Sequence, residues 1–405
     1  MRILVITYNF LQFYNPSSIQ ARRFFLELAE NGHQITVLTN KEKNTIEFQH
    51  KNIEVIEVFS IKKKFGFKLA SILRFRELNF MPDWDLFFWN PFIWLKLRLK
   101  ININEFDVVH TIASPFSTHL IPLYFVKRPN TLFVAQFYDP WVDNSYINLR
   151  FNFFKKLNLR LEKMVAEKAD LIIHTNSIIV DKWEKRYGVN TMIKNLIIPL
   201  CMENNIVNKV KSIPLPEKNS KIIISHVGSI YGKRNLNTLI KALQFIFDTQ
   251  KNILNDLTIN LVGTIEASEL KKLKFLKFKE IFNLTGNVSH EESLIFMSQA
   301  SWLLLLEEEG EEGLFFPSKL TDYLAVYKPI MGIIPKNCVS REILSENGHH
   351  SFDHEEVENI ANFIISLSKR NDVEINNKIS TLEVKNVVSI YEHSIEKLMD
   401  NKKII

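Results

Sequence analysis

The residues best suited to chemistry lie between positions 307 and 335. Pro317 and Ser318 are start signals for a short helix. Lys319 and Asp322, three residues apart, would share the polar face of that helix. Free N–H groups at a helix N-terminus suit a phosphate, a lysine could neutralise it, and a carboxylate could accept hydrogen bonds from two neighbouring sugar hydroxyls. The segment favours a nucleotide or a nucleotide-sugar, and a merely solvated helix face is the alternative.

A second group of polar residues follows the apolar run at 221–227. Lys233 and Arg234 stand directly before the next helical pattern, and Gly228 and Gly232 flank the turn. Two cations at a strand-to-helix turn are placed to hold a diphosphate, although a solvated basic turn would have the same sequence. Neither G-x-x-x-x-G-K-[ST] nor G-x-G-x-x-G occurs, which argues against ATP and NAD enzymes of those types.

A third set of candidates lies in the first half of the chain. Asp139 follows the apolar run at 132–137 and could contact a sugar hydroxyl or act as a base. A turn cap before Pro140 is the alternative role for this carboxylate. Ser114 and His119 are weaker candidates, because a histidine inside an apolar pattern is more often packed than reactive.

The elements that would position these residues are apolar, β-branched runs that alternate with helical patterns. Such runs cover residues 3–7, 35–39, 108–112, 132–137, 171–174 and 197–200, and then 221–227, 257–262, 282–285, 302–306 and 330–334. This alternation is typical of βαβ units and parallel sheets. The short helix near residue 320 would bury Leu320, Tyr323, Leu324 and Tyr327.

Domain boundaries follow from the polar stretch at 202–221, which carries two prolines and little periodicity. We predict an α/β chain with an N-terminal domain over residues 1–202 and a second domain over residues 203–380. A last helical segment, residues 381–405, is expected to pack back on the first domain. A length of 405 residues with 46% hydrophobic residues is enough for two cores.

Glycines point to the second domain as the ligand-binding one. The chain has only 11 glycines, and seven of them fall between Gly228 and Gly332, several at the ends of predicted strands. Ligands of open α/β sheets bind at the carboxyl ends of the strands. We therefore expect the nucleotide in the second domain.

Cysteine usage and the start of the chain limit the cellular context. Cys201 and Cys338 are far apart and match no metal spacing, which fits a reducing cytoplasm and argues against zinc. The start MRILVITYNF has no small-residue cleavage site and is interpreted as a strand. No stretch reaches the roughly 18 uninterrupted apolar residues of a membrane span. We expect a cytoplasmic protein, either soluble or peripheral at the inner face of the plasma membrane.

The net charge of +6 is concentrated between residues 62 and 100. Basic and aromatic side chains mixed in this way suit an anionic membrane surface. Core aromatics with solvated lysines are the alternative, and no nucleic-acid motif supports a nucleic-acid partner. The segment contains the cations Lys62, Lys63, Lys64, Lys68, Arg74, Arg76, Lys96, Arg98 and Lys100 and the aromatics Phe65, Phe67, Trp84, Phe87, Phe88, Trp89, Phe92 and Trp94.

Four phrases, in order, resemble a known family. The opening ends in GHQITVLT, HVGSIYGKRN follows the domain boundary, LTGNVSHEES precedes the buried run at 302–306, and FPSKLTDYLAVYKPI contains the candidate helix. Together they resemble bacterial glycosyltransferases of the GT-B fold, most closely family 4 of the retaining enzymes, over nearly the whole chain. The resemblance implies two tandem Rossmann-like domains facing a cleft, with the donor in the C-terminal domain and the acceptor in the N-terminal one.

The resemblance also assigns roles on the donor side. Asp322 takes the place of the glutamate that usually binds the nucleotide ribose, and Arg234 takes that of the diphosphate-binding lysine. The donor site implied in this way comprises Gly228, Ser229, Lys233, Arg234, Pro317, Ser318, Lys319 and Asp322.

Two departures from the family pattern stand in the donor domain. Ser229 replaces an arginine, and Leu314 replaces the first glutamate of the family's E-x7-E pair. The role of that glutamate is either absent or moved to Glu311 or Glu312. We expect the acidic run at 307–312 to face sugar hydroxyls, an amine or solvent, because it would repel a diphosphate.

On the acceptor side, Asp139 matches the family's aspartate and is the expected catalytic residue, while Tyr138 occupies the position of its histidine. Ser17, Ser18 and Arg22 replace the usual glycine-rich acceptor loop. Ser114 and His119 complete the expected acceptor side.

The implied reaction is transfer of a sugar, with retention and without a metal or other cofactor, from a nucleoside diphosphate-sugar to a saccharide acceptor. The acceptor is expected to be lipid-linked and part of a surface polysaccharide, lipopolysaccharide or capsule. Two alternatives remain: a catalytically degenerate partner subunit, suggested by Ser229 and Leu314, and a UDP-sugar 2-epimerase of the same fold. The residues do not identify the base, the sugar or the acceptor.

Overall fold

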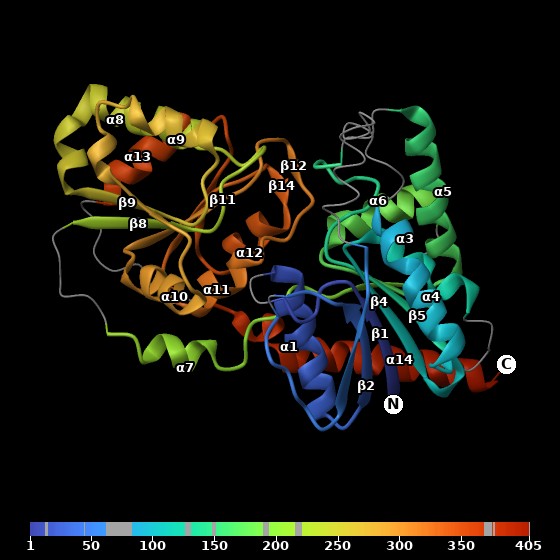
Figure 1. Cartoon of the computed structure of the whole chain (residues 1–405). Coiled ribbons are helices and arrows are strands. Elements are labelled where there is room, and N and C mark those ends of the chain that lie inside the picture. The colour runs from blue at the N-terminus through green and yellow to red at the C-terminus, as the bar shows by residue number, and fades with distance from the viewer. Residues whose placement is uncertain are drawn as a thin grey trace. The chain divides into compact units, whose positions relative to one another are not determined.

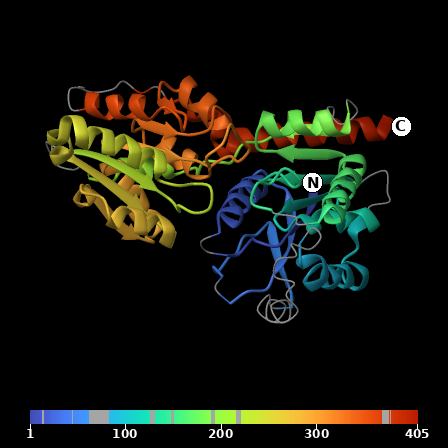
Figure 2. The ribbon, with the colours of Figure 1, turned by 90° about the horizontal axis from the view of Figure 1, so that it is seen from above.

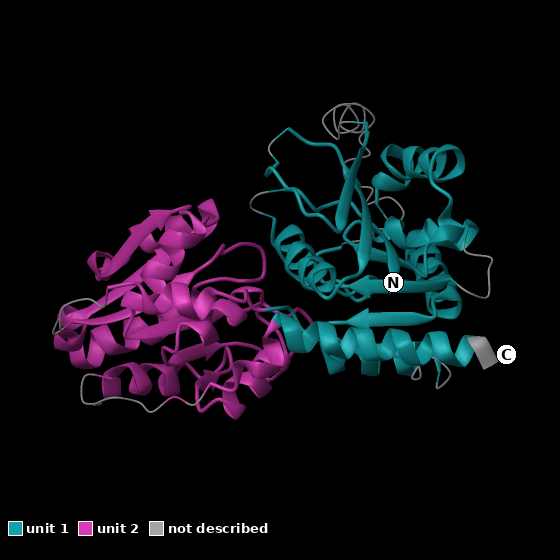
Figure 3. Ribbon diagram, turned by 90° about the horizontal axis from the view of Figure 1, so that it is seen from below, with its two compact units in different colours: residues 1–201, 384–405 teal, residues 202–383 magenta. Residues whose placement is uncertain are grey.

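The structure is a computed structural model that describes residues 1–12, 15–43, 45–61, 83–125, 131–147, 151–188, 194–214, 221–367, 375 and 377–404. The chain forms two compact units, coloured separately in Figure 3. Unit 1 contains residues 1–201 and 384–405, and unit 2 contains residues 202–383.

Unit 1 is built on a parallel sheet. Its described strands follow the order β3-β2-β1-β4-β5-β6-β7. Figure 1 labels β1, β2, β4 and β5 of this sheet. The strands are β1 (Arg2–Thr7), β2 (Gln34–Asn40), β3 (Ile53–Val58), β4 (Val108–Ala113), β5 (Leu132–Phe137), β6 (Leu171–His174) and β7 (Asn195–Ile197). β4 and β5 are buried along their whole length, as expected for central strands of a sheet covered on both faces.

Helices cover both faces of this sheet. Tyr391 of α14 packs against Phe24 of α1 on one face, and Trp89, directly before α4, and Ile93 of α4 fill the other. Figure 2 shows α14, in red, running along unit 1. The helices are α1 (Pro16–Glu30), α3 (Asp85–Phe88), α4 (Asn90–Leu99), α5 (Asn152–Lys168), α6 (Ser177–Tyr187) and α14 (Val384–Ile404), with the 3-10 turns η2 (Ile103–Glu105), η3 (Phe116–Leu120) and η4 (Pro122–Tyr124).

Unit 2 repeats the plan with a second parallel sheet, ordered β10-β9-β8-β11-β13-β15 over the described residues. Its strands are β8 (Ile222–Val227), β9 (Leu257–Val262), β10 (Phe282–Gly286), β11 (Trp302–Leu306), β13 (Ile330–Ile333) and β15 (His350–Phe352). A separate ribbon pairs β12 (Glu312–Gly313) with β14 (Asn337–Cys338). The continuous apolar sequence WLLLL of β11 is buried on both faces, which places it at the centre of the sheet.

The helices of unit 2 bury amphipathic faces against this sheet. Leu239 and Ile246 of α8 and Ile360 and Ile364 of α13 belong to one hydrophobic core. The helices are α7 (Ile206–Lys211), α8 (Asn237–Gln250), α9 (Ala267–Lys274), α10 (His290–Gln299), α11 (Lys319–Ala325), α12 (Val339–Glu346) and α13 (Val357–Leu367), with the 3-10 turns η6 (Lys251–Asp256), η7 (Lys279–Ile281) and η8 (Ile379–Leu382).

The predicted α/β class with two parallel sheets is confirmed. The prediction that the short helix buries Tyr327 is wrong. α11 ends at Ala325, and Tyr327 adopts a positive φ of 55° with 44% of its surface exposed, so it does not continue the buried face of Leu320, Tyr323 and Leu324. Within the described part of the chain, no helix is both long and apolar enough to cross a membrane.

Candidate functional site

The predicted donor residues of unit 2 meet where β8 ends and α11 begins. Gly228 follows β8 with a φ of +139°, and a Cβ atom there would lie 3.0 Å from Nζ of Lys319. Gly263, after β9, is equally constrained, because its Cβ would lie 2.8 Å from the carbonyl oxygen of Gly228. The two glycines let the backbone turn tightly and leave room for the lysine. The structure therefore brings Gly228 and Lys319 together.

Lys319 is held by a histidine that sequence reasoning did not select. Nδ1 of His226 lies 2.9 Å from the carbonyl oxygen of Leu304, and Nε2 lies 3.1 Å from Nζ of Lys319. His226 stands in the otherwise apolar β8 strand and is fully buried. A histidine in such a run is usually packed in a core, which is why the pattern gave no indication of a role in the site.

The electrostatics of this cluster are set by burial. Desolvation lowers the pKa of Lys319 well below its ordinary value, nearby Arg234 lowers it further, and Glu307 opposes the shift. Burial raises the pKa of Glu307 to about 7, against the effects of Ser340, Arg234 and Lys319. Two cations thus share a poorly solvated place with one carboxyl group. An anionic ligand there would be stabilised by both cations.

The two cations of the turn after β8 differ in environment. Nη1 of Arg234 donates to the carbonyl oxygen of Ser229 at 3.2 Å, and its guanidinium group lies 5.9 Å from the ring centre of Tyr231. Its Nε is buried and has no hydrogen-bond partner among the described residues. Lys233 is exposed. Arg234 thus belongs to the buried cluster, Ser229 contributes its carbonyl oxygen, and Lys233 lies at the surface.

Asp322 is placed by the packing of α11. The Tyr323 hydroxyl accepts a hydrogen bond from the N–H of Val227 at 2.8 Å and donates to the carbonyl oxygen of Leu304 at 3.1 Å, which ties α11 to β8 and β11. One helical step earlier, Oδ2 of Asp322 lies 3.1 Å from Nε2 of His290, the first residue of α10. The Asp322 side chain is 14% exposed. A carboxylate in this position can reach a ligand at the edge of the sheet.

The start of α11 lies where it was predicted, but its N-cap residue makes no side-chain capping hydrogen bond. Pro317 is buried just before the helix, and Ser318 occupies the N-cap position without a capping hydrogen bond from its side chain. Ser318 instead accepts from the Thr321 hydroxyl through its carbonyl oxygen, at 2.8 Å.

We had expected the whole acidic run at 307–312 to face sugar hydroxyls, an amine or solvent. In the structure its glutamates do not share one environment. Glu307 and Glu308 are buried, whereas Glu311 and Glu312 are exposed, Glu312 as the first residue of β12. Glu307 lies under Gly313, where a Cβ would come within 3.2 Å of its Oε2. The glutamate nearest the cations is therefore Glu307, not the two suggested by sequence spacing.

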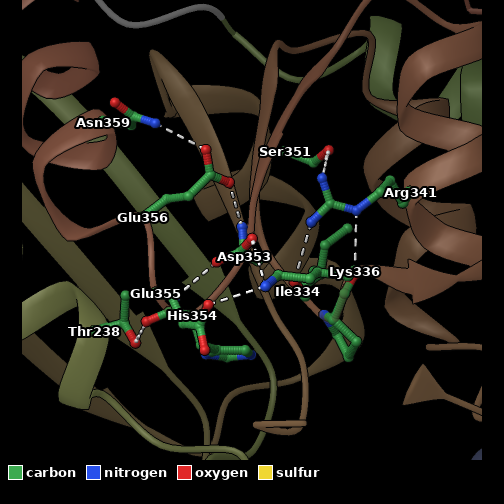
Figure 4. A network of polar contacts seen from close by, with 11 residues as sticks. Thr238, Ile334, Lys336, Arg341, Ser351, Asp353, His354, Glu355, Glu356 and Asn359 are labelled. Carbon is green, nitrogen blue, oxygen red and sulfur yellow. Dashed lines mark hydrogen bonds and ion pairs between the residues drawn. The ribbon is translucent and has the colours of Figure 1, made fainter. Parts of the chain in front are cut away.

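A polar network on the β13–β15 side supports this run (Figure 4). His354 donates from Nε2 to the carbonyl oxygen of Glu308 at 3.2 Å. The Thr238 hydroxyl donates to the carbonyl oxygen of His354 at 3.1 Å. Arg341 donates to the carbonyl oxygen of Ile334 at 3.3 Å. These bonds fix the backbone that follows β11 and β13.

In unit 1, Asp139 lies directly after β5. Burial raises its pKa to about 6, and no described residue forms a hydrogen bond or ion pair with its carboxylate. The backbone beside it is fixed, because the carbonyl oxygen of Tyr138 accepts a hydrogen bond from the Thr175 hydroxyl at 3.3 Å. Burial also raises the pKa of the Tyr138 hydroxyl. Asp139 thus presents a partly desolvated carboxylate with no capping bond to the described residues.

The loop that carries Asp139 is anchored by buried polar residues of α5 and α6. The indole N–H of Trp141 donates to Oδ1 of Asn158 at 2.8 Å. Arg186 pairs with Asp143 at 2.5 Å and with buried Glu162 at 3.1 Å. Asp143 therefore holds the loop in place.

The expected acceptor-side residues have mostly structural contacts. His119 is buried, its Nδ1 lies 2.7 Å from the Thr111 hydroxyl, and burial lowers its pKa to about 3, so it is a packed neutral histidine. Ser114 is exposed, and its carbonyl oxygen accepts from the side-chain amide of Asn9 at 3.4 Å.

Ser17, Ser18 and Arg22 belong to α1 and not to a loop. The buried Ser18 hydroxyl donates to Oε1 of Gln12 at 3.0 Å, and Arg22 donates to the carbonyl oxygens of Phe10 and Gln12. Both hold the segment before α1, while Ser17 is half-buried.

Two further expectations concern metals and the basic aromatic segment. The described residues contain no group of three or more His, Cys, Asp or Glu side chains that could hold a metal ion. The first part of the segment lies outside the described residues, and Trp89 in its second part is a core residue while Phe87, Leu95 and Leu99 are exposed. Of the cations and aromatics named for this segment, those outside the described residues are Lys62, Lys63, Lys64, Phe65, Phe67, Lys68, Arg74 and Arg76.

Comparison with known proteins agrees with this architecture. Residues 18–197 match the model of Glycosyltransferase Family 4. None of the curated proteins compared with the chain matches it. Among solved structures, the lipopolysaccharide outer core galactosyltransferase WaaB is 13% identical, with a TM-score of 0.61 over 98% of this chain and 99% of that one.

Two synthases show the same similarity of fold. Sucrose-phosphate synthase from Thermosynechococcus elongatus is 13% identical, with a TM-score of 0.61 over 98% of this chain and 95% of that one. An α,α-trehalose-phosphate synthase from Burkholderia xenovorans is 9% identical, with a TM-score of 0.65 over 98% and 100%. The chain therefore has the GT-B fold of these glycosyltransferases, and its residues 18–197 match the family 4 model.

Proposed function

We propose that the protein is a retaining, metal-independent glycosyltransferase. It moves a sugar from a nucleoside diphosphate-sugar to a lipid-linked saccharide acceptor in the synthesis of a surface polysaccharide, lipopolysaccharide or capsule. The observation that carries the donor assignment is the pair of Lys319 and Arg234 at the glycine-rimmed end of β8.

The donor side of the proposal rests on charge. A sugar nucleotide leaves behind a nucleoside diphosphate, and negative charge develops on it as the glycosidic bond breaks. Lys319 and Arg234 stabilise that charge where little water screens it. The Asp322 carboxylate, three residues from Lys319 on α11, accepts hydrogen bonds from the ribose hydroxyls.

Structures with a similar fold hold ligands of this chemistry. A TarM structure from S. aureus contains UDP, at 10% identity and a TM-score of 0.59. A trehalose-6-phosphate protein from E. coli contains UDP-2-fluoro glucose, at 11% identity and the same TM-score. These neighbours support a nucleotide-sugar donor for this chain.

On the acceptor side, Asp139 contacts the donor sugar or the acceptor hydroxyl. Its carboxylate forms no bond with a described residue, and it follows β5 at the edge where ligands of such sheets bind. The proposed acceptor is lipid-linked, and the exposed apolar side chains Leu95 and Leu99 beside Arg98 and Lys100 support contact with an anionic membrane surface.

Alanine at Arg234 and at Asp322 tests the donor site. We expect Arg234→Ala to lower the rate constant of transfer by about 10²- to 10³-fold, because one preorganised cation is removed from the leaving group. Asp322→Ala should mainly raise the KM for the donor. Lys241→Ala, an exposed lysine on α8, is the matched control. Unchanged transfer and donor binding in both site variants would overturn the assignment.

A thermal-shift panel of UDP-, GDP-, ADP- and CMP-linked sugars identifies the donor, because a ligand selective for the folded state raises the melting temperature. An unchanged melting temperature with every nucleotide-sugar would favour the inactive partner subunit, for which Ser229 and buried Leu314 are the motivating features. Conversion of a UDP-sugar to an epimer without acceptor and without free UDP would favour the 2-epimerase.

A further inference from the structure

The carboxyl end of β8 contains a buried histidine with hydrogen bonds at both ring nitrogens. His226 has no exposed surface and lies between the carbonyl oxygen of Leu304 and Nζ of Lys319. The neighbours that complete its surroundings include Gly228, two residues further on, and Arg234.

The two contacts define the protonation state of the ring. A carbonyl oxygen can only accept, so Nδ1 of His226 carries the proton and donates to Leu304 at 2.9 Å. Nε2 then has a free lone pair, which accepts from the Lys319 ammonium group at 3.1 Å. The pKa of His226 agrees with this neutral form, because burial lowers it well below its ordinary value and Lys319 and Arg234 lower it further.

Lys319 keeps donors for a ligand in this arrangement. An ammonium group has three N–H donors, and among the described residues only His226 accepts from it. The Lys319 side chain has four rotatable bonds and would otherwise be mobile. The contact with Nε2 of His226 holds Nζ beside Gly228, where the missing Cβ leaves room for it. The remaining donors stay available at the strand end.

We propose that His226 is a positioning residue that holds Lys319 Nζ beside Gly228 in the geometry required to bind the diphosphate of the donor. The inference rests on the proposed function and adds to it a residue that contacts no substrate. His226 preorganises a cation before the ligand arrives, and preorganisation of a flexible side chain increases affinity without adding a contact.

Two substitutions separate the two hydrogen bonds of the ring. In His226→Asn the short amide can still donate to Leu304 but does not reach Lys319. In His226→Gln the longer side chain can present an amide oxygen to Lys319. His349→Asn is the matched control, because His349 is a second buried histidine of unit 2, 3.4 Å from the N–H of Ile330.

Binding is measured by titration calorimetry with UDP, GDP and ADP and with the corresponding nucleosides. For the diphosphate that the wild type binds best, His226→Asn should weaken binding about tenfold or more, as expected for a lost charge-assisted contact. His226→Gln should recover part of the loss. Nucleoside affinity should stay unchanged, and His349→Asn should bind both ligands like the wild type.

A double substitution tests whether His226 affects diphosphate binding through Lys319. If His226 acts through Lys319, His226→Asn should have no further effect on diphosphate binding in a Lys319→Met background. Diphosphate affinity that is unchanged in His226→Asn, or a loss equal for nucleoside and diphosphate, would overturn the inference. Failure of the wild type to bind any nucleoside diphosphate would instead refute the proposed function.

A spectroscopic measurement covers the case in which His226→Asn does not fold. In the full chain with ¹⁵N-labelled histidine, the Nδ1–H tautomer is expected for His226, with an Nε2 resonance that moves in Lys319→Met and on addition of the bound diphosphate. An Nε2–H tautomer, or a resonance that responds to neither change, would contradict a role in holding Lys319.

Discussion

Among the five glutamates of residues 307–312, burial distinguishes Glu307. Its pKa of about 7 in the folded protein exceeds the ordinary value of 4.5. Between these values the folded state keeps a proton that the unfolded chain has lost. The stabilising contribution of this group is therefore complete below pH 4.5 and is lost as the pH rises through 7.

Glu307→Gln should remove this dependence. The free energy of unfolding of the wild type should fall by roughly 3 kcal/mol, relative to the variant, between pH 4.5 and pH 8. Urea unfolding at both pH values measures the difference, which reports on Glu307 together with Lys319, because the Glu307 carboxylate raises the pKa of that lysine. Glu309→Gln, at an exposed position, is the control. Parallel pH profiles of wild type and Glu307→Gln would refute the assignment.

Asp139 should control the acid side of the pH–rate profile. With its pKa raised to about 6 by burial, the carboxylate is ionised above pH 6 and protonated below it, so the rate of transfer should fall as the pH drops through 6. Asp139→Asn should lower kcat by about 10²- to 10⁴-fold and remove that acid limb. Asp181→Asn, exposed on α6, should keep both the rate and the limb. An unchanged limb in Asp139→Asn would show that another group titrates.

Sequence patterns selected Arg234 because it stands at a strand-to-helix turn, and Lys319 and Asp322 because they share the polar face of a predicted short helix. Sequence patterns could not select His226, because it stands in an apolar run and its partner Lys319 lies more than 90 positions away in the sequence. Glu307 was indistinguishable from its neighbours for a related reason. Its burial depends on the ribbon of β12 and β14, which sequence periodicity does not predict.

At the scale of elements, the Tyr323 hydroxyl links α11 to both β8 and β11. Tyr323→Phe would remove the acceptor for the buried N–H of Val227 and the donor to Leu304. An unpaired buried polar group costs about 1–3 kcal/mol, so unfolding of unit 2 should require less urea. Because Lys319 and Asp322 belong to the same helix, the KM for the donor should rise as well.

The control for α11 is Tyr391→Phe, which changes a buried tyrosine of unit 1. It should alter stability without changing the KM for the donor. A Tyr323→Phe protein with the donor KM and stability of the wild type would show that packing alone positions α11.

Central strands were predicted, whereas among the edge strands β10 was predicted and β3 and β15 were missed. Strands such as β11 and β5 are buried on both faces and therefore appear as continuous apolar runs. The edge strands β3 and β15 are partly exposed, carry polar residues, and were not predicted. β7 was expected at 197–200 but ends at Ile197, because backbone pairing with β6 and not hydrophobicity sets its register.

At the scale of the whole molecule, the chain leaves unit 1 after Cys201 and returns to it at Val384. α14 then contributes Val387, Tyr391 and Ile395 to the core that α1 and the sheet share. The hydroxyl oxygen of Tyr391 also lies 3.1 Å from Nδ1 of buried His110. Unit 1 is therefore completed by residues from both sides of unit 2 in the sequence.

The net charge of +6 gives a prediction for the molecule as a whole. We expect the full chain to sediment with vesicles of anionic lipid at low salt and not with neutral vesicles. Exposed Leu95 and Leu99 would enter the interface while Arg98 and Lys100 meet the headgroups. At about 1 M salt, where the Debye length is about 3 Å, binding should be lost.

Charge reversal locates the surface that contacts the lipid. The triple change Lys96→Glu, Arg98→Glu and Lys100→Glu at the end of α4 should weaken vesicle binding well beyond the effect of altered net charge. The matched control reverses three exposed lysines of unit 2, Lys271, Lys274 and Lys277, and produces the same net charge. Equal loss in both triple variants would indicate attraction by net charge alone, and no binding by the wild type would leave the aromatic residues of 83–100 a purely structural role. Since both variants carry the same charge, only a local contact can separate them.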